Sequence, residues 1–386
     1  MPGITKIKLR YLYVAFILLT IATSVQVIIA SFGQAFPRYG NYIIFSQSFE
    51  HLLGNLNLYE AYPGIQNDLY KYSPAFSVLM APFYYLPKWL GFTCFQLLNT
   101  GIFLLGIRKI VPDTKQQQFV LIYLLLEVGK ALTYCQTNLL ITGLLLLAFY
   151  SLEKGKIIWA TLFITLTVYI KIFGILAYAL WLFYPKKSAF IKYTILWNLV
   201  FLIMPLLLIS PDQLIWQYQN WFTLLRSDHD GSIGISFAGW LQNLLRLNIS
   251  KNAVLITGIL LFCLSLSKIS SYKSELYRKL MISSILIWVV IFNHKGESAT
   301  YIIALTGAAI WYFSQPANLI NKILLWIGFL STTAAGIDLI TPGWIIREYV
   351  TPYSIEAIGC SLIWLKLVYD QLFSIHHSSS LKPSDP

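Results

Sequence analysis

Long hydrophobic runs separated by short polar segments make up most of this chain. The runs are continuous, so they predict helices and exclude the alternating strands of a membrane barrel. Runs that approach the 20 or so apolar residues needed to cross a bilayer, several of them too short to cross alone, lie near 11–32, 89–107, 119–133, 137–150, 157–184, 190–209, 252–267, 280–293, 299–314, 321–340 and 354–374. The pattern predicts an all-α, polytopic helical membrane protein with about 10–12 transmembrane helices.

No polar stretch is long enough for a separate soluble domain, and no internal repeat is evident. We therefore expect one integral membrane domain over residues 1–376 and a short polar tail over 377–386. The sizeable early loop is 33–73, and the apolar spacing of its centre, "NYIIFSQSFEHLL", predicts an amphipathic helix on the outer membrane surface. Tyrosine side chains suited to a lipid interface accompany it at positions 39, 42, 59, 62 and 70.

Two of the hydrophobic runs contain predicted breaks. Pro74, Pro82 and Pro87 interrupt the segment after the loop, so residues 74–86 either re-enter the membrane or cross it where it is locally thin. The run 157–184 has lysines at both ends, at 154 and 156 and at 186 and 187. A hairpin bent near 169–174, with Lys171 at its tip, would keep both lysine pairs on one side of the membrane. Broken helices at this depth are tolerated where they line a cavity in the protein.

Composition and charge support a multi-pass protein of the cell membrane. Of the 386 residues, 57% are hydrophobic and 11% are charged, against about 25% charged in soluble domains. The net charge of +12 would suggest a nucleic-acid partner in a soluble protein, but here it follows from basic loops on the cytoplasmic side. That assignment puts both termini in the cytoplasm and leaves 33–73, 210–250, 293–298 and 341–356 on the outer face, together with most of the acidic residues. We expect no nucleic-acid partner.

The segment "FNHKGESATY", residues 292–301, gathers more polar groups than a plain turn between two apolar runs requires. His294 and Lys295 are suited to bind a phosphate through charge-assisted hydrogen bonds. Glu297 is suited to act as a general base, provided that it reaches a substrate hydroxyl. Because charges inside a membrane protein are costly, they are functional candidates.

Three further charged groups each have a structural alternative. Asp68 and Lys71, next to Tyr72, form either an ordinary solvated pair or part of a sugar or headgroup site. Lys171 needs an anion, and a carboxylate or a ligand phosphate would serve equally. Glu127 and Lys130 are three residues apart on one helix face, where a structural ion pair is favoured over a mechanistic role.

The chain lacks a phosphate-binding Walker loop, a GxGxxG fingerprint, an HExxH zinc motif and a serine-nucleophile elbow. Its four cysteines lie singly in apolar runs, so they indicate neither disulfides nor a metal cluster. We expect no metal site and no cofactor. A lipid-linked phosphosugar fits the remaining groups, because its phosphate requires cations, its sugar requires aromatic rings and carboxylates, and its prenyl tail requires a membrane.

The segment 57–87, "NLYEAYPGIQNDLYKYSPAFSVLMAPFYYLP", resembles the signature that follows the first span in glycosyltransferase family 87. The residues that match in order are Leu58, Tyr59, Tyr72, Pro74, Pro82, Leu86 and Pro87. Further along, Gln136, Asn138 and Lys171 resemble the family's glutamine-x-asparagine helix and the lysine-centred break that follows it. These are GT-C type membrane transferases that use polyprenyl-phosphate sugars, among them mycobacterial phosphatidylinositol mannoside mannosyltransferases.

The resemblance implies transfer of a hexose, mannose-like, from a polyprenyl-phosphate donor to a lipid or glycan hydroxyl on the outer face. It implies inversion by direct displacement. Membrane lipids surround the enzyme, and Tyr72, Gln136, Asn138 and Asn41 join the substrate-binding candidates. The phosphate-binding candidates are Lys71, Lys171, His294 and Lys295, and the base candidates are Asp68 and Glu297.

One departure from the family pattern affects the base. Members carry an aspartate early in the first outer loop, where this chain has Asn41, whose amide cannot accept the acceptor's proton. Either Asp68, Glu60 or Glu297 replaces it, or the chain has lost transferase activity. The alternatives to a transferase are therefore a transporter or flippase of lipid-linked sugars and a non-catalytic envelope-polysaccharide assembly protein.

Overall fold

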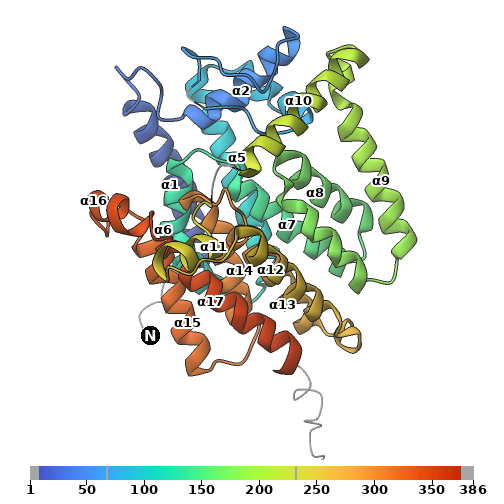
Figure 1. The fold of residues 1–386 in the computed structure, drawn as a ribbon, viewed down its shortest axis with the longest axis vertical. Helices are drawn as coiled ribbons and strands as arrows, with labels where there is room; N and C mark the ends of the chain where they lie inside the picture. The colour runs from blue at the N-terminus through green and yellow to red at the C-terminus, as the bar shows by residue number, and fades with distance from the viewer. Residues whose placement is uncertain (1–7, 67, 231–232, 375–386) are drawn as a thin grey trace, which may run out of the picture. The chain divides into compact units, whose positions relative to one another are not determined.

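The computed structural model describes residues 8–66, 68–230 and 233–374, and these residues form helices joined by loops (Figure 1). The predicted all-α class is confirmed. The polar tail expected at 377–386 lies outside the described residues. The chain divides into two compact units, Met1–Tyr178 with Tyr184–Gly231 and Ala179–Phe183 with Ser232–Pro386, and each is considered by itself. The single domain expected over 1–376 stays a prediction.

The first unit contains α1 to α10 and the start of a 3₁₀ helix. Their bounds are α1 Leu9–Ile29, α2 Gly40–Leu53, α3 Pro74–Leu79, α4 Ala81–Tyr84, α5 Lys88–Ile110, α6 Thr114–Thr133, α7 Asn138–Glu153, α8 Ile157–Ile170, the 3₁₀ helix Ile172–Phe183, α9 Lys187–Ile203 with a 3₁₀ turn Met204–Leu207, and α10 Pro211–Asp230. The helix α1 packs on α5 and α6, and α7 packs between α5 and α8. The central α7 is buried along almost its whole length, which explains why it is apolar on every side.

Among the described residues, the second unit is built from five longer helices and several short turns. Their bounds are α11 Phe237–Gly239 with a π turn Trp240–Leu244, α12 Lys251–Leu266, α13 Glu275–Ile291, α14 Tyr301–Phe313, α15 Leu319–Gly328 with a π turn Phe329–Ala334, α16 Gly343–Ile345 with a π turn Ile346–Val350, and α17 Ile355–Tyr369. The helix α17 packs against α13, α14 and α15. The segment 292–301 lies between α13 and α14.

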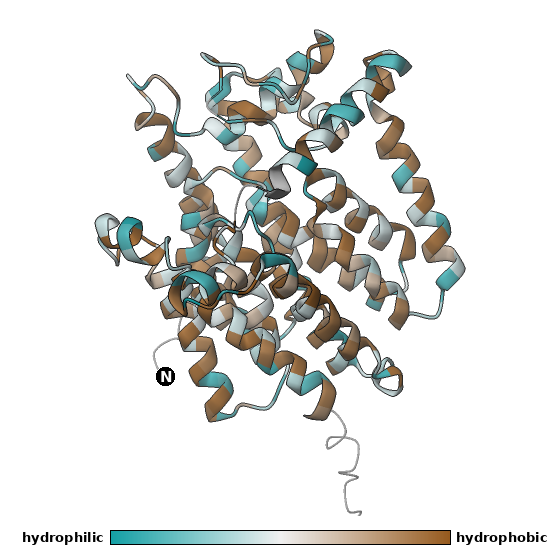
Figure 2. Ribbon diagram, viewed as in Figure 1, coloured by the Kyte–Doolittle hydropathy of each residue, from teal (hydrophilic) through white to brown (hydrophobic). Residues whose placement is uncertain are grey.

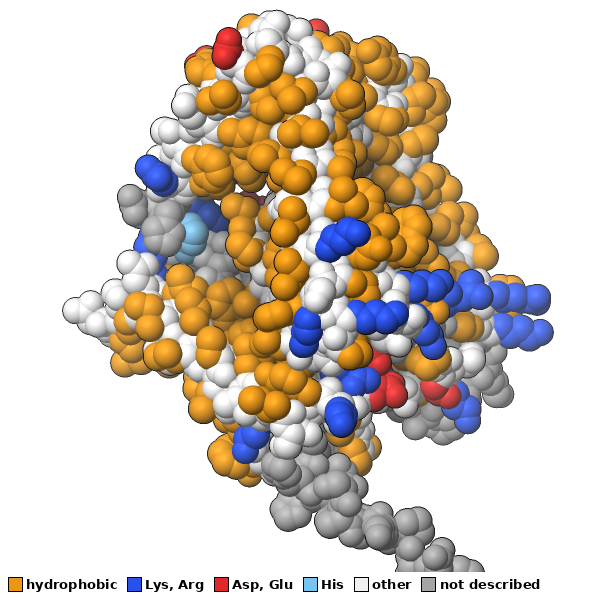
Figure 3. Space-filling model, turned by 90° about the vertical axis from the view of Figure 1, so that its right-hand side faces the viewer, with side chains coloured by type: hydrophobic (Ala, Val, Ile, Leu, Met, Phe, Trp, Pro, Cys, Tyr) orange, Lys and Arg blue, Asp and Glu red, His pale blue; other side chains and the backbone are white. Residues whose placement is uncertain are grey.

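Three helices are long and apolar enough to cross a membrane by themselves, judged by length and composition over the described residues: α1, α5 and Lys187–Leu207. Shorter apolar helices include α7, α8, α12 and α15. Hydrophobic residues line the helices in Figure 2, and hydrophobic side chains cover much of the face in Figure 3. On α9 the exposed residues include Ile191, Ile195 and Leu199, which water would not favour but lipid would. The number of crossings stays a prediction.

The predicted hairpin at Lys171 is confirmed. The helix α8 ends at Ile170, and the hydroxyls of Thr165 and Tyr178 lie 2.8 Å apart, although 13 residues of continuous helix would separate them by about 20 Å. At the open end of the hairpin, the Tyr184 hydroxyl donates to Glu153 Oε1 at 2.5 Å. The lysines that flank the hairpin therefore lie at the same end.

Glycine allows the two limbs of this hairpin to meet. A Cβ atom on Gly174 would lie 2.0 Å from Thr167 Oγ1 and 2.8 Å from the Ile164 carbonyl oxygen. No larger residue fits there unless the limbs separate.

The proline-rich segment forms two short helices, α3 and α4, rather than one long one. Ser73 caps α3 by accepting a hydrogen bond from the Phe76 amide. The helix expected in the 33–73 loop is α2, but the tyrosines around it do not all lie at a lipid interface as expected. Tyr42, Tyr59 and Tyr70 are buried in the first unit, where their hydroxyls have hydrogen-bond partners. Burial raises the pKa of each phenol.

Candidate functional site

The turn between α6 and α7 presents two amide side chains. The helix α6 ends at Thr133 and α7 begins at Asn138, and Cys135 takes the left-handed backbone conformation, at φ 56°, that reverses the chain. The Asn138 side chain donates from Nδ2 to Gln136 Oε1 at 2.9 Å, and both residues are buried. The side-chain oxygens of Gln136 and Asn138 also accept hydrogen bonds from one common donor.

That common donor is Lys171. Its ammonium lies 3.3 Å from Gln136 Oε1 and 3.3 Å from Asn138 Oδ1, so residues 33 and 35 apart in the sequence meet. Amide oxygens are neutral, and these two contacts therefore orient the ammonium without neutralising its charge. Lys171 follows the last residue of α8, so it lies at the break between α8 and the 3₁₀ helix Ile172–Phe183.

Aromatic rings complete the surroundings of the ammonium. It lies 5.9 Å from the centre of the Tyr72 ring and 5.5 Å from that of Phe173, distances at which cation–π attraction operates. The Tyr59 hydroxyl donates to the Tyr72 carbonyl at 3.0 Å, and the Ser73 hydroxyl donates to the Tyr169 carbonyl at 2.6 Å. These bonds attach the 33–73 loop to the end of α8 and fix Tyr72 beside Lys171.

The same place holds the N-terminus of α7. The first amides of a helix have no partner within it, and with the helix dipole they favour a bound anion. Thr137, at the N-cap position, gives no side-chain cap, and its buried Oγ1 makes no hydrogen bond within the part of the chain that the structure describes. Lys171, the helix N-terminus and this hydroxyl are therefore candidate groups for binding an anion.

Asn41 has a structural task that the sequence did not reveal. Its Nδ2 donates to the Tyr134 carbonyl at 2.8 Å, and so it attaches the start of α2 to the turn that carries Gln136. An ionised carboxylate cannot donate, and one placed here would face the carbonyl oxygen. The amide at position 41 therefore supports the site instead of serving as a base.

Asp68 and Lys71 form the pair expected from their spacing, with Oδ1 and Nζ 3.6 Å apart and the side chains 59% and 39% exposed. Asp68 Oδ1 also accepts from the Leu69 amide at 2.7 Å. An exposed pair adds little stability, so either partner can exchange it for a ligand at small cost. The backbone is better fixed than the side chains, because Trp221 Nε1 donates to the Lys71 carbonyl at 3.2 Å.

Part of the polarity of 292–301 has a structural purpose in the second unit. The Ile235 amide donates to the Gly296 carbonyl at 2.8 Å, and the Lys295 amide donates to Asn293 Oδ1 at 2.9 Å. The Ser298 hydroxyl donates to Glu356 Oε2 at 2.5 Å, and Glu356 is fully buried. These bonds fix the shape of the turn.

Glu356 belongs to the segment 341–356 that was expected on the outer face, and its side chain is buried within the second unit, whereas its side of the membrane stays a prediction. The available signal was its position at the start of the apolar run 354–374, where an acid in the first turn of a helix is common. Of the candidates in the turn, Glu297 is exposed and His294 and Lys295 are half-buried, each with interactions to other groups. They belong to the second unit and Asp68, Lys71 and Lys171 to the first, so a shared pocket stays a prediction.

Glu127 and Lys130 form the ion pair that their spacing predicts, and its structural rather than mechanistic role stays a prediction. Lys130 Nζ lies 3.0 Å from Glu127 Oε1, and both side chains are buried within α6. Among the described residues, no three His, Cys, Asp or Glu side chains gather as a metal site would require.

Comparison with known proteins gives a family and a distant structural likeness. The model of glycosyltransferase family 87 matches residues 70–318, a range that contains Lys71, Tyr72, Gln136, Asn138, Lys171 and 294–297 but neither Asn41 nor Asp68. No curated protein matches the chain. Among solved structures, ArnT from Cupriavidus metallidurans bound to undecaprenyl phosphate is similar at 13% identity and a TM-score of 0.38, over 96% of this chain and 82% of that one.

Proposed function

We propose a reaction for this chain, which belongs to glycosyltransferase family 87: transfer of a hexose from a polyprenyl phosphate to a hydroxyl of a lipid or glycan, on the outer face of the cell membrane. The hexose is mannose-like, as the resemblance of the 57–87 segment implies. The donor's tail stays in the membrane, and its phosphate enters the site beside Lys171.

The observation that carries this proposal is the convergence of Lys171, Tyr72 and the N-terminus of α7 on one place. A phosphate needs a cation and several N–H or O–H donors, and the Lys171 ammonium, the first amides of α7 and the Thr137 hydroxyl supply both. The Tyr72 ring offers an apolar face for the sugar that the phosphate carries. No other group of side chains considered among the described residues combines these features.

The reaction is a displacement at the anomeric carbon of the sugar. The acceptor oxygen bonds to that carbon as the bond to the phosphate oxygen breaks, and the configuration inverts. The electron pair leaves with the polyprenyl phosphate, whose added charge Lys171 and the more exposed Lys71 stabilise. The acceptor's proton passes to a carboxylate, and Asp68 and Glu297 are the two candidates.

Lys171→Met tests the proposal, with Lys192→Met as the matched control because Lys192 is an exposed lysine of α9 outside the site. Loss of one preorganised donor to a developing charge typically lowers the rate by about 10²–10³. We expect that loss in sugar transfer and weaker donor binding for Lys171→Met, with an unchanged thermal midpoint, and wild-type behaviour for the control. A lower midpoint with full transfer would instead identify Lys171 as a structural residue.

A further inference from the structure

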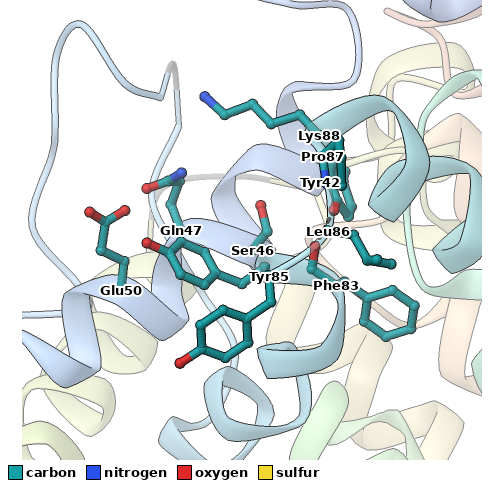
Figure 4. A pocket seen from close by; sticks show the side chains of 10 residues that line it. Tyr42, Ser46, Gln47, Glu50, Phe83, Tyr85, Leu86, Pro87 and Lys88 are labelled. Carbon is teal, nitrogen blue, oxygen red and sulfur yellow. Dashed lines mark hydrogen bonds between the residues drawn. The ribbon is translucent and has the colours of Figure 1, made fainter.

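A polar cleft lies in the first unit, and the proposed reaction does not use it. It has a volume of about 380 Å³, within the range of roughly 300–1,000 Å³ that small-ligand sites occupy. Residues from α2, from the end of α4, from the segment that joins α4 to α5 and from the start of α5 line it: Tyr42, Ser46, Gln47, Glu50, Phe83, Tyr84, Tyr85, Leu86, Pro87 and Lys88. In Figure 4, Gln47 and Glu50 lie together at one side, and Lys88 extends above from the start of α5.

The walls of the cleft are fixed by packing. The buried Tyr42 hydroxyl donates to the Phe83 carbonyl at 3.0 Å. A Cβ atom on Gly91 would lie 2.1 Å from the Tyr42 hydroxyl oxygen, so only glycine lets α5 approach so closely. The Phe49 ring packs against Tyr84 at 5.4 Å and Tyr85 at 5.6 Å between centres. The site is therefore formed before any ligand arrives.

The polar groups of the cleft suit a ligand with many hydroxyls. Glu50 and Lys88 are exposed and of opposite sign, and Gln47 adds an amide that both donates and accepts. Burial, and then the charge of Glu50 and a hydrogen bond to its carboxylate, raise the pKa of Tyr84, so this phenol is directed to Glu50. A phosphate would meet the Glu50 carboxylate, whereas a neutral sugar can donate to Glu50 and Gln47 and lay its apolar face on the exposed Tyr85 ring.

Neighbouring faces of α2 contact this cleft and the surroundings of Lys171. Tyr42, Ser46 and Glu50 follow one another at four-residue spacing along one face of α2. On another face, Phe45 packs against Tyr72 at 4.7 Å, and Asn41 bonds to the turn that carries Gln136. An α-helix with its side chains is about 10–12 Å across. A molecule that occupied both places would therefore be longer than one sugar ring.

We propose that this cleft is a remote acceptor subsite, which holds a non-reacting sugar of the acceptor while another hydroxyl reacts beside Lys171. The inference rests on the proposed function and specifies its substrate class: an acceptor glycan or glycolipid with more than one sugar. Contacts to remote parts of a substrate contribute binding that positions the reacting group. A longer acceptor therefore gains more from this cleft than a single sugar does.

Photolabelling without any donor tests this subsite independently of sugar transfer. The probe is an alkyl mannobioside that carries a diazirine on the sugar distal to the alkyl chain, added to the full-length protein in lipid nanodiscs. We expect mass spectrometry to find the label in peptides that contain 42–50 or 83–88. Unlabelled alkyl mannobioside should compete with it, and excess phosphatidylglycerol should not.

Glu50→Gln combined with Gln47→Ala should weaken labelling of these peptides by about 10–100-fold, as expected when hydrogen bonds to a charged group are lost. Glu348→Gln, at an exposed glutamate of the second unit, is the matched control and should label as wild type does. The thermal midpoint of each variant confirms that it is folded.

Two results would overturn the subsite: label that the double variant leaves unchanged, or label that phosphatidylglycerol displaces, which would identify a phospholipid headgroup site. Both differ from a failure of the proposed function, which would show as full transfer by Lys171→Met. Labelling of the cleft in a protein that transfers no sugar would keep the glycan site and reject the reaction.

Discussion

Lys171 and the segment 292–301 looked alike in the sequence, since each places charge within apolar runs, but the structure uses them differently. Lys171 is held by two neutral amide oxygens and an aromatic ring from distant parts of the first unit. In the second unit, several polar groups of 292–301 bond to the turn itself, to Ile235 or to the buried Glu356. The first arrangement fixes the position of a charge, which the proposed function assigns to a ligand phosphate, and the second fixes the shape of a turn.

The difference shows that polar content alone does not identify a catalytic segment. A buried polar group without a partner is costly, so a turn inside apolar helices needs internal hydrogen bonds whether or not it binds a substrate. The two amide contacts of Lys171, by contrast, join residues far apart in the sequence and fix where its ammonium lies. Four predictions test how far this contrast extends.

The largest effect concerns the base, because either region could supply it. Asp68→Asn and Glu297→Gln keep the side-chain shape and remove proton-accepting power. One of them should lower sugar transfer by about 10²–10⁴ without changing donor binding. Transfer assays on the purified variants, with donor binding measured separately, decide between the regions. Wild-type rates in both variants would mean that neither residue is the base, and they would favour the assembly-protein alternative.

Next in size is the effect of the amides that orient Lys171. Gln136→Ala removes one of them, and a hydrogen bond to a charged group contributes roughly 1.5–3 kcal/mol, so we expect donor affinity to fall about 10–100-fold. Gln315→Ala, at a glutamine of the second unit whose side chain bonds weakly at 3.4 Å, is the control. Donor titrations of both variants measure the effect. Equally small changes in donor affinity for Gln136→Ala and Gln315→Ala would mean that the Gln136 amide does not contribute to donor binding.

The hydrogen bond between Ser298 and Glu356 should contribute more to stability than to catalysis. Ser298→Ala leaves the buried Glu356 without its hydroxyl donor, which should cost about 1–3 kcal/mol and lower the thermal midpoint. Transfer per folded molecule should stay near the wild-type value, and Ser298→Thr should restore the midpoint. If Ser298→Ala is as stable as wild type but inactive, the contrast between the two regions fails.

Asn41→Asp should have the smallest effect, because Asn41 only attaches the start of α2 to the turn that carries Gln136. The carboxylate cannot donate to the Tyr134 carbonyl, so the turn that carries Gln136 loses a hydrogen bond worth about 0.5–1.5 kcal/mol. We expect a modest fall in both thermal midpoint and donor affinity. A rise in transfer would show instead that an aspartate at position 41 still works as the family's base.

The sequence by itself determined the elements and where they break. Apolar periodicity, the three prolines and the lysines on both sides of 157–184 were enough to predict most of the helices, a break in the segment 74–86, and the hairpin at Lys171. The helix α10, in the segment 210–250, was not among the predicted runs. These signals are local, because a helix or a turn depends on residues a few positions apart. The ordered motifs of 57–87 and 134–171 also indicated the family that residues 70–318 match.

Only the tertiary structure decided which polar groups meet. The contact of Lys171 with Gln136 and Asn138 joins residues 33–35 positions apart, and the support from Asn41 spans 93. The burial of Tyr59, Tyr70 and Glu356 likewise depends on what packs around them, since the same side chains would be stable at a lipid or water surface. Contacts of this kind arise from helix packing, which no local pattern of residues encodes.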